Sequence, residues 1–292
     1  MIVAAAAEPT LTWNLVHDVR QVFEFPFMVN AFRAGTIVAV VAGVIGWFMV
    51  LRRQSFAGHT LAVVGFPGAA GAVLLGISAT YGMFAFAVVA ALVIALVPTT
   101  GGRSYGEESA VTGTVQAFAL ACGFLFLSLY GGFLGATTTL LFGSFLGITQ
   151  SQVGLLLVVG AVALAVLAAI GRRLFFASVD PDVAAARTVP VRALSVTFLV
   201  LLGVAAAEVS QITGALLVFA LLVVPAATAQ AVTTRVWLSL SLTVCVGLFV
   251  VWSSLLVAYY SPYPIGFFVT SIAFAVYLLA HVGGRLSRTA TR

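Results

Sequence analysis

Glu208 is the only carboxylate that falls inside one of the long apolar runs of this sequence. An acid in such a run is costly to bury and is by default a candidate functional group. Gln211 follows three residues later, which on a helix places it on the same face. We expect this pair either to contact cargo or a binding protein, or to be a structural polar group solvated at the outer end of its helix.

His59 and Gln116 are the other candidates for a polar substrate path within apolar runs. For His59 the alternative is a structural polar residue near the cytoplasmic end of its run. Glu107 and Glu108 precede the run of Gln116, and carboxylates in a helix's first turn complement its dipole. The chain contains no HExxH motif, no GxSxG motif and no paired carboxylates in an apolar run. It therefore offers no catalytic residues for a membrane-embedded enzyme.

All 13 cationic residues are arginine, and lysine is absent. A Walker A loop needs its lysine on the nucleotide phosphates, so any ATP that drives this protein must be bound by another chain. The chain itself is expected to bind no cofactor. Its basic pI, near 9.7, is explained by loop arginines that set membrane orientation and not by nucleic-acid binding.

The elements that position these residues must be membrane helices. The chain is 62% hydrophobic and 7% charged, whereas soluble domains carry about 45–50% apolar and about 25% charged residues. Ser109–Gly171 and Val236–Gly284 contain no Asp, Glu, Lys or Arg, and each is long enough for two spans. The composition predicts an all-α, polytopic membrane protein in contact with the lipid bilayer.

Charges and Gly/Pro/Ser turns divide the chain into nine predicted spans, with eight as the alternative count. Placing Arg52 and Arg53 in the cytoplasm puts 11 of the 13 arginines there, with the N-terminus outside and the C-terminus inside. Gly135–Ile148 is too short to cross and is predicted to be a re-entrant or surface helix. The spans lie near residues 34–51, 57–77, 80–98, 109–131, 152–171, 192–209, 212–232, 236–259 and 264–282.

Three ordered blocks of sequence resemble the membrane permeases of the zinc/manganese ABC importers. The first block combines FPFM, VLRRQSFAG and FPG, the second is LFGSFLGI, and the third combines QITGALL with VVPAATA. They begin at Phe25, Leu141 and Gln211 respectively and follow the family's order. Such a combination is much more specific than a single short motif.

The resemblance implies the fold of a type II ABC importer and the role of a transport subunit. It implies a second copy of the chain, separate ATPase subunits that bind ATP, and an extracytoplasmic substrate-binding protein. The expected location is the bacterial plasma membrane. The predicted domains are a tail over 1–27, a permease domain over 28–284, and a cytoplasmic tail over 285–292. The pattern over Thr10–Phe25 fits either an interfacial helix or an extended tail.

The chain departs from the family at the position that would bind metal. In the family an Asp and a His stand four residues apart on one helix face, whereas here His59 takes the place of the Asp and Val63 that of the His. His59 is thus the only candidate metal ligand. A lone imidazole suits a hard ion such as Mn²⁺ poorly, so the cargo is expected to be a Zn/Mn-class ion, a metal-containing ligand or a non-metal solute.

The longest polar cytoplasmic segment, residues 175–192, matches the position of the family's coupling helix. Asp180 as N-cap and Pro181 at the first helical position predict a short helix that ends before Pro190. Docking on the ATPase is expected to use Asp180, Pro181, Asp182, Ala185 and Arg187. The competing interpretations are a solvated linker at this segment and, for the whole chain, a stand-alone secondary transporter or channel.

Overall fold

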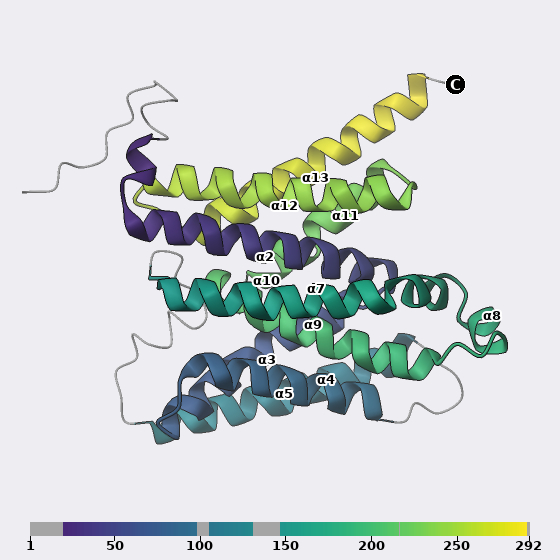
Figure 1. Cartoon of the computed structure of the whole chain (residues 1–292), viewed down its shortest axis with the longest axis horizontal. Helices are drawn as coiled ribbons and strands as arrows, with labels where there is room; N and C mark the ends of the chain where they lie inside the picture. Colours follow the sequence, from purple (N-terminus) through teal and green to yellow (C-terminus); the bar gives the residue numbers. More distant parts are fainter. Residues whose placement is uncertain (1–19, 98–104, 131–146, 216, 291–292) are drawn as a thin grey trace, which may run out of the picture.

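The computed structural model describes residues 20–97, 105–130, 147–215 and 217–290. These residues form an all-helical bundle with no strand among them, which confirms the predicted fold class (Figure 1). The helices are α2 (Pro26–Leu51), α3 (Ser55–Leu74), α4 (Ala79–Leu96), α5 (Tyr105–Leu129), α7 (Gln150–Val179), α8 (Pro181–Ala186), α9 (Val191–Thr213), α10 (Val218–Leu222), α11 (Val224–Val232), α12 (Val236–Tyr259) and α13 (Ile265–Ala290).

Eight helices of the described chain are long and apolar enough to cross a membrane. The span predicted over 212–232 is instead broken into the short helices α10 and α11. Gly214 ends α9 with a φ of 77°, a backbone conformation that glycine adopts without strain. Pro225 stands in the first turn of α11, where its missing N–H leaves no hydrogen bond unmade.

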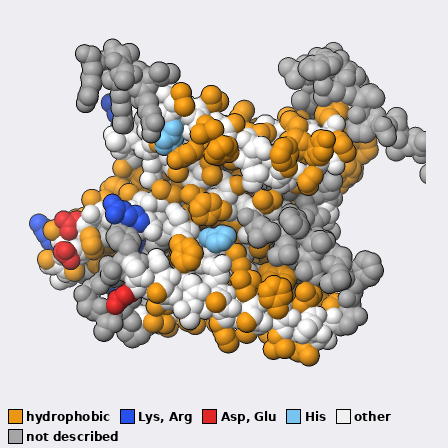
Figure 2. Space-filling model, turned by 180° about the vertical axis from the view of Figure 1, so that it is seen from behind, with side chains coloured by type: hydrophobic (Ala, Val, Ile, Leu, Met, Phe, Trp, Pro, Cys, Tyr) orange, Lys and Arg blue, Asp and Glu red, His pale blue; other side chains and the backbone are white. Residues whose placement is uncertain are grey.

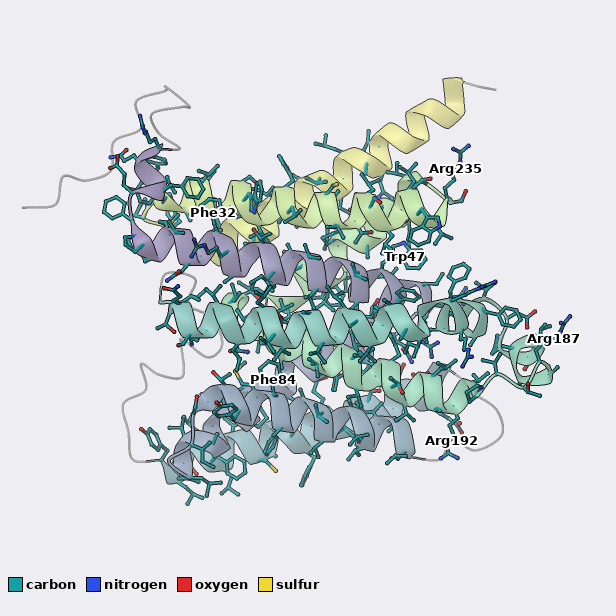
Figure 3. The ribbon with its side chains drawn as sticks, viewed as in Figure 1. Phe32, Trp47, Phe84, Arg187, Arg192 and Arg235 are labelled. Atoms are coloured by element: carbon teal, nitrogen blue, oxygen red, sulfur yellow. The ribbon has the colours of Figure 1, made fainter. Side chains whose placement is uncertain are left out.

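The broken segment carries the chain from one end of the bundle to the other. Figure 3 places Arg187, Arg192 and Arg235 at one end of the bundle, which we call the arginine end, and Phe32 toward the opposite end. The helix α9 begins next to Arg192 at the arginine end and runs toward the opposite end. The chain then returns, so that Arg235 lies at the arginine end again. The chain therefore makes a ninth passage between α9 and α12, although this passage is not one continuous helix.

The core of the bundle consists of α2, α3 and α9, while α5, α7 and α13 turn most of their apolar surface outward. Small residues allow the inner helices to approach closely. A β-carbon on Gly68 of α3 would meet the backbone carbonyl of Gly82 on α4, and one on Gly82 would meet that of Gly68. Close packing at Gly68 is what membrane helices require, because lipid supplies no hydrophobic drive between them.

Several helices extend beyond the predicted boundaries. The helix α7 runs to Val179, although the prediction ended this span at 171 and began the coupling segment at 175. The prediction began the first span after Arg33, but α2 begins at Pro26 and includes Arg33, which is exposed on its surface. The last helix continues to Ala290, into the predicted tail over 285–292. The tail over 1–27 is described only from residue 20, and the predicted helix over Gly135–Ile148 lies almost wholly outside the described residues.

Candidate functional site

His59 is the fifth residue of α3 and is half-buried against the broken segment. Its imidazole ring meets the ring of Phe219 on α10 edge-on, with the centroids 5.9 Å apart. Figure 2 shows histidine side chains on the rear face of the bundle among hydrophobic ones. Val63, one turn further along α3, is buried. Among the described residues no group of three His, Cys, Asp or Glu side chains gathers to hold a metal ion.

Gln116 lies on α5 and is tied to the residue that follows His59. The buried hydroxyl of Thr60 donates a hydrogen bond of 2.8 Å to Oε1 of Gln116. This bond joins α3 to α5 inside the apolar bundle, where both polar groups need a partner. Gln116 therefore holds α5 against the helix that carries His59, and its amide nitrogen is left for other contacts.

Glu208 is fully buried, which differs from the solvated position that the sequence suggested. The helix α9 continues five residues beyond it to Thr213, so the carboxyl group does not lie at the helix end. It points at Gly160 of α7: a β-carbon on that glycine would lie 2.9 Å from Oε1 of Glu208 and 2.8 Å from Cγ2 of Val41 on α2. Neither carboxyl oxygen has a hydrogen-bond partner among the described residues.

Glu208 and His59 lie on different sides of α9. Two residues after Glu208, Ser210 donates a hydrogen bond of 3.5 Å to the carbonyl of Ala62 on α3. Successive helical residues are about 100° apart, so Ser210 and Glu208 face nearly opposite directions. Gln211 lies within about 60° of Glu208, and its buried Nε2 also has no partner among the described residues. The predicted path residues thus form two groups, one around α3 and one facing α2 and α7.

The predicted coupling segment forms the short helix α8. Oδ1 of Asp180 accepts a 3.0 Å hydrogen bond from the backbone N–H of Val183, and Pro181 occupies the first turn. The helix ends at Ala186, and its C-cap Arg187 is followed by Thr188 at a φ of 59°. Ala184 is fully buried on the bundle, whereas the other residues of this short helix are exposed. The exposed residues include Asp182, Ala185 and, at the C-cap, Arg187.

Arg52 forms hydrogen bonds to both helices that flank α8, namely α7 and α9. The sequence did not indicate these contacts. Its guanidinium donates hydrogen bonds of 3.0 Å to Oγ of Ser178 on α7 and 2.9 Å to Oγ of Ser195 on α9. The same group lies 5.3 Å from the ring centroid of Phe198. In the sequence Arg52 indicates only membrane orientation, because nothing local links it to serines more than 120 residues away.

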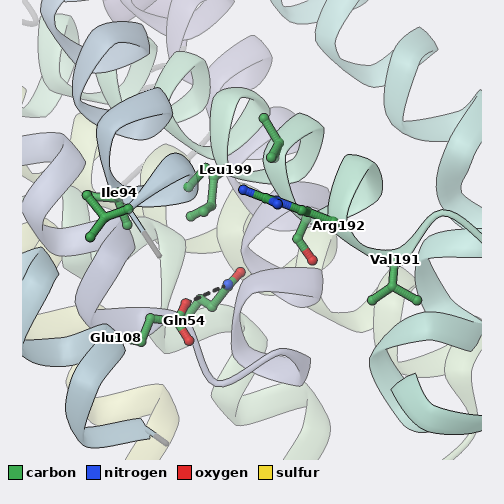
Figure 4. A pocket seen from close by; sticks show the side chains of 10 residues that line it. Gln54, Ile94, Glu108, Val191, Arg192 and Leu199 are labelled. Atoms are coloured by element: carbon green, nitrogen blue, oxygen red, sulfur yellow. Dashed lines mark hydrogen bonds between the residues drawn. The ribbon is translucent and has the colours of Figure 1, made fainter. Parts of the chain in front are cut away.

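A hollow of about 430 Å³, lined by apolar side chains and by Gln54, Glu108, Arg192 and Ser195, lies at the arginine end where α3, α4, α5 and α9 meet. In Figure 4, Glu108 and Arg192 lie on different sides of it, and Nε2 of Gln54 donates a 3.0 Å hydrogen bond to Oε1 of Glu108. Glu108 stands in the first turn of α5, as the dipole argument expected. Through its hydrogen bond with Gln54, Glu108 also joins the beginnings of α3 and α5. The sequence did not indicate this contact.

Three comparisons with known proteins agree with this architecture. The model of the ABC 3 transport family matches residues 24–284. The chain is 27% identical to the manganese transport system membrane protein MntC of Halalkalibacterium halodurans, over 80% of this chain and 79% of the relative. It is 28% identical to the manganese import system permease protein ScaB of Streptococcus parasanguinis, over 77% and 79% of the two chains.

The structure is similar to a chain of PsaBC from Streptococcus pneumoniae, solved in complex with a Fab. The TM-score is 0.80 at 24% sequence identity, and the match covers 91% of this chain and 95% of that one. This likeness shows a shared fold. The family match covers most of the sequence and includes the blocks that carried the resemblance. The chain therefore belongs to the ABC 3 transport family, and it is a membrane permease subunit of an ABC transporter, not an enzyme.

Proposed function

We propose that this permease imports a divalent transition metal of the manganese–zinc class. The observation that carries the proposal is the placement of His59, in the segment where the family binds metal, beside the break between α9 and α11. A break in a membrane helix is tolerated where it lines a path or is buried in protein. The names of the relatives, both of which refer to manganese, support the same class of cargo.

A small metal complex is the second candidate cargo. His59 supplies one nitrogen ligand, and Val63 supplies none where the family has its second ligand. An imidazole suits zinc, copper, iron or nickel, whereas manganese prefers oxygen ligands. A metal that arrives already bound to its own ligands needs fewer from the path. Two copies of the chain facing each other would offer two such imidazoles to either cargo.

The proposed assembly has two copies of this chain and separate ATPase subunits that bind ATP. We assign the arginine end to the cytoplasm, because membrane proteins carry their excess arginine on that side. The N-terminus is then outside and the C-terminus inside the bacterial plasma membrane. The exposed surface of α8 at the arginine end suits docking on the ATPase, and the opposite end suits an extracytoplasmic binding protein.

The test is metal uptake into vesicles that contain the permease, its ATPase and its binding protein. We expect His59→Ala to lower the initial rate of ⁵⁴Mn or ⁶⁵Zn uptake at least tenfold. The matched control is His281→Ala, because His281 lies on α13 and its Nδ1 is 3.2 Å from the carbonyl oxygen of Tyr277, within one helical turn. Full uptake by the His59 variant would contradict the path, and uptake without the ATPase would contradict the ABC mechanism.

The same assay distinguishes the two cargoes. Free metal ions should compete with the labelled ion if the permease carries the ion itself. If a complex is carried, uptake of the label should require an added chelator, and excess free metal should not inhibit it.

The substitution Gln116→Leu should lower metal uptake less than His59→Ala does, because the side-chain carbonyl of Gln116 already accepts a hydrogen bond from Thr60.

A further inference from the structure

A groove at the end of the bundle opposite the arginine end runs along three helices. Figure 1 shows α2 lying between α12 and α7, and α2 packs against both of them. The groove has a volume of about 620 Å³ and follows the helix axes, because each helix contributes residues one turn apart. Its lining includes Val29, Arg33 and Ile37 of α2, Val153 and Leu157 of α7, and Trp252 and Leu256 of α12.

The walls of this groove are apolar, and its one indole N–H is already bonded. Nε1 of Trp252 donates a 3.0 Å hydrogen bond to Oγ1 of Thr36, which in turn donates to the carbonyl of Phe32. Both polar groups are thus satisfied inside the protein. The groove offers hydrocarbon contacts along most of its length, and an acyl chain parallel to the helices makes such contacts.

Arg33 is the only charged residue among the described residues that line the groove. It is exposed, and no described residue forms an ion pair or a hydrogen bond with its guanidinium. It stands seven residues after the start of α2, about 10 Å along the helix axis. Side chains on a helix tilt toward its N-terminus, so Arg33 reaches toward the nearer membrane surface. An arginine side chain at this depth can bring its charge to the headgroup region, where lipid phosphate groups can pair with it.

We propose that this groove is a binding site for an anionic phospholipid of the leaflet opposite the arginine end. The phosphate group accepts hydrogen bonds from Arg33, whose planar fork of N–H donors matches phosphate oxygens. One acyl chain lies between Leu157 of α7 and Trp252 of α12, on the floor formed by α2. Basic pockets between membrane helices on the cytoplasmic or matrix side bind anionic headgroups in this way, and Arg33 offers the same charge pairing in the other leaflet. The described lining of the groove contains no residue of α3 or α10, the helices that carry His59 and Phe219, so the groove is separate from the group around His59.

The test measures lipid retention and thermal unfolding of the purified full-length permease in mixed micelles. Phosphatidylglycerol is added to one sample and phosphatidylcholine with the same acyl chains to another. We expect the wild type to retain phosphatidylglycerol about tenfold more strongly than phosphatidylcholine. This ratio corresponds to about 1.4 kcal/mol, the contribution expected from one charged contact with the headgroup. Arg33→Gln should remove most of this preference. Arg235→Gln removes the same charge at the other end of the bundle and should preserve it.

Two further samples separate the lipid from other occupants. Inorganic phosphate alone should not raise the unfolding temperature, and Leu157→Trp, which fills the groove, should weaken retention of both lipids. Equal retention of the two lipids by the wild type would overturn the proposal. So would a phosphate effect as large as that of the lipid, or a preference unchanged in Arg33→Gln. If deletion of residues 1–19 were needed before any lipid bound, the N-terminal segment and not a lipid would be the occupant.

Discussion

Replacing Glu208 by methionine tests whether its buried carboxyl group is retained for stability or for transport. The side chain is fully buried between α9, α7 and α2, and neither oxygen has a hydrogen-bond partner among the described residues. Burial of such a group without a partner costs about 1–3 kcal/mol. Methionine has a similar length and no polar oxygen, so Glu208→Met should raise the free energy of unfolding by about 1–3 kcal/mol.

Two further substitutions at this position are matched controls. Glu208→Gln keeps the shape of the side chain and still buries polar atoms, so it should change stability by less than about 1 kcal/mol. Glu208→Ala removes the polar atoms but leaves a cavity, and the lost packing of a buried side chain costs about 2–5 kcal/mol. Only methionine should give a clear gain.

Gly160 provides an independent measure of the same contact. Its alanine variant would place a β-carbon 2.9 Å from Oε1 of Glu208 and 2.8 Å from Cγ2 of Val41. Overpacking of this kind typically costs about 1–3 kcal/mol. In a protein that already carries Glu208→Ala, only the clash with Val41 remains. The loss of unfolding free energy caused by Gly160→Ala should therefore be smaller in that background. Contacting residues couple by about 0.5–3 kcal/mol in such double-mutant cycles.

Stability is measured by unfolding in mixed micelles of increasing dodecyl sulfate content, and uptake is measured in vesicles with the same variants. A methionine variant that is more stable but inactive would show that the carboxyl group is retained for transport. One that is more stable and active would show that it is dispensable. The reasoning is refuted if methionine lowers stability and Gly160→Ala costs the same in both backgrounds, because Glu208 would then have a partner and would not contact Gly160.

Three shorter predictions concern other contacts. Gly46→Ala should destabilise the fold by about 3 kcal/mol or more, since its β-carbon would meet the backbone carbonyl of Leu222 in α10; unchanged unfolding would show that the broken segment shifts freely. Arg52→Ala should cost about 2 kcal/mol or more through its lost charged hydrogen bonds, and Arg52→Lys should recover part of it in the same assay. Ala185→Trp on the exposed side of α8 should change stability by about 0.5 kcal/mol or less and lower transport-coupled ATPase activity at least tenfold. Normal coupling in reconstituted complexes would contradict docking there.

Features set by neighbouring residues were predictable from the sequence. Asp180 and Pro181 predicted the start of α8, because an N-cap carboxylate and a proline in the first turn act within one turn of helix. The apolar runs predicted the long helices for a similar reason: a bilayer requires about 20 apolar residues for each crossing. The first span was placed too late because Arg33 was taken as a boundary. A long arginine side chain can reach the membrane surface from inside a span.

Features set by packing between distant segments were not predictable. The glycine and proline that interrupt the predicted span over 212–232 are visible in the sequence, but hydropathy does not show that the helix breaks there. The side of α9 on which Glu208 lies depends on which helices surround it, and those come from residues 41 and 160. The contacts of Arg52 with Ser178 and Ser195 likewise require the folded bundle.

The helix α7 connects the groove, the buried Glu208 and the short helix α8. It has 30 residues, about 45 Å of helix, and contains no proline between Gln150 and Val179. One end contributes Val153 and Leu157 to the groove, its middle meets Glu208 at Gly160, and its other end leads into α8. Both α7 and α9 pack against α8 and against each other. Because α7 has no proline at which to bend, a displacement of α8 must either tilt α7 as a unit or be absorbed at Asp180, where the backbone is extended.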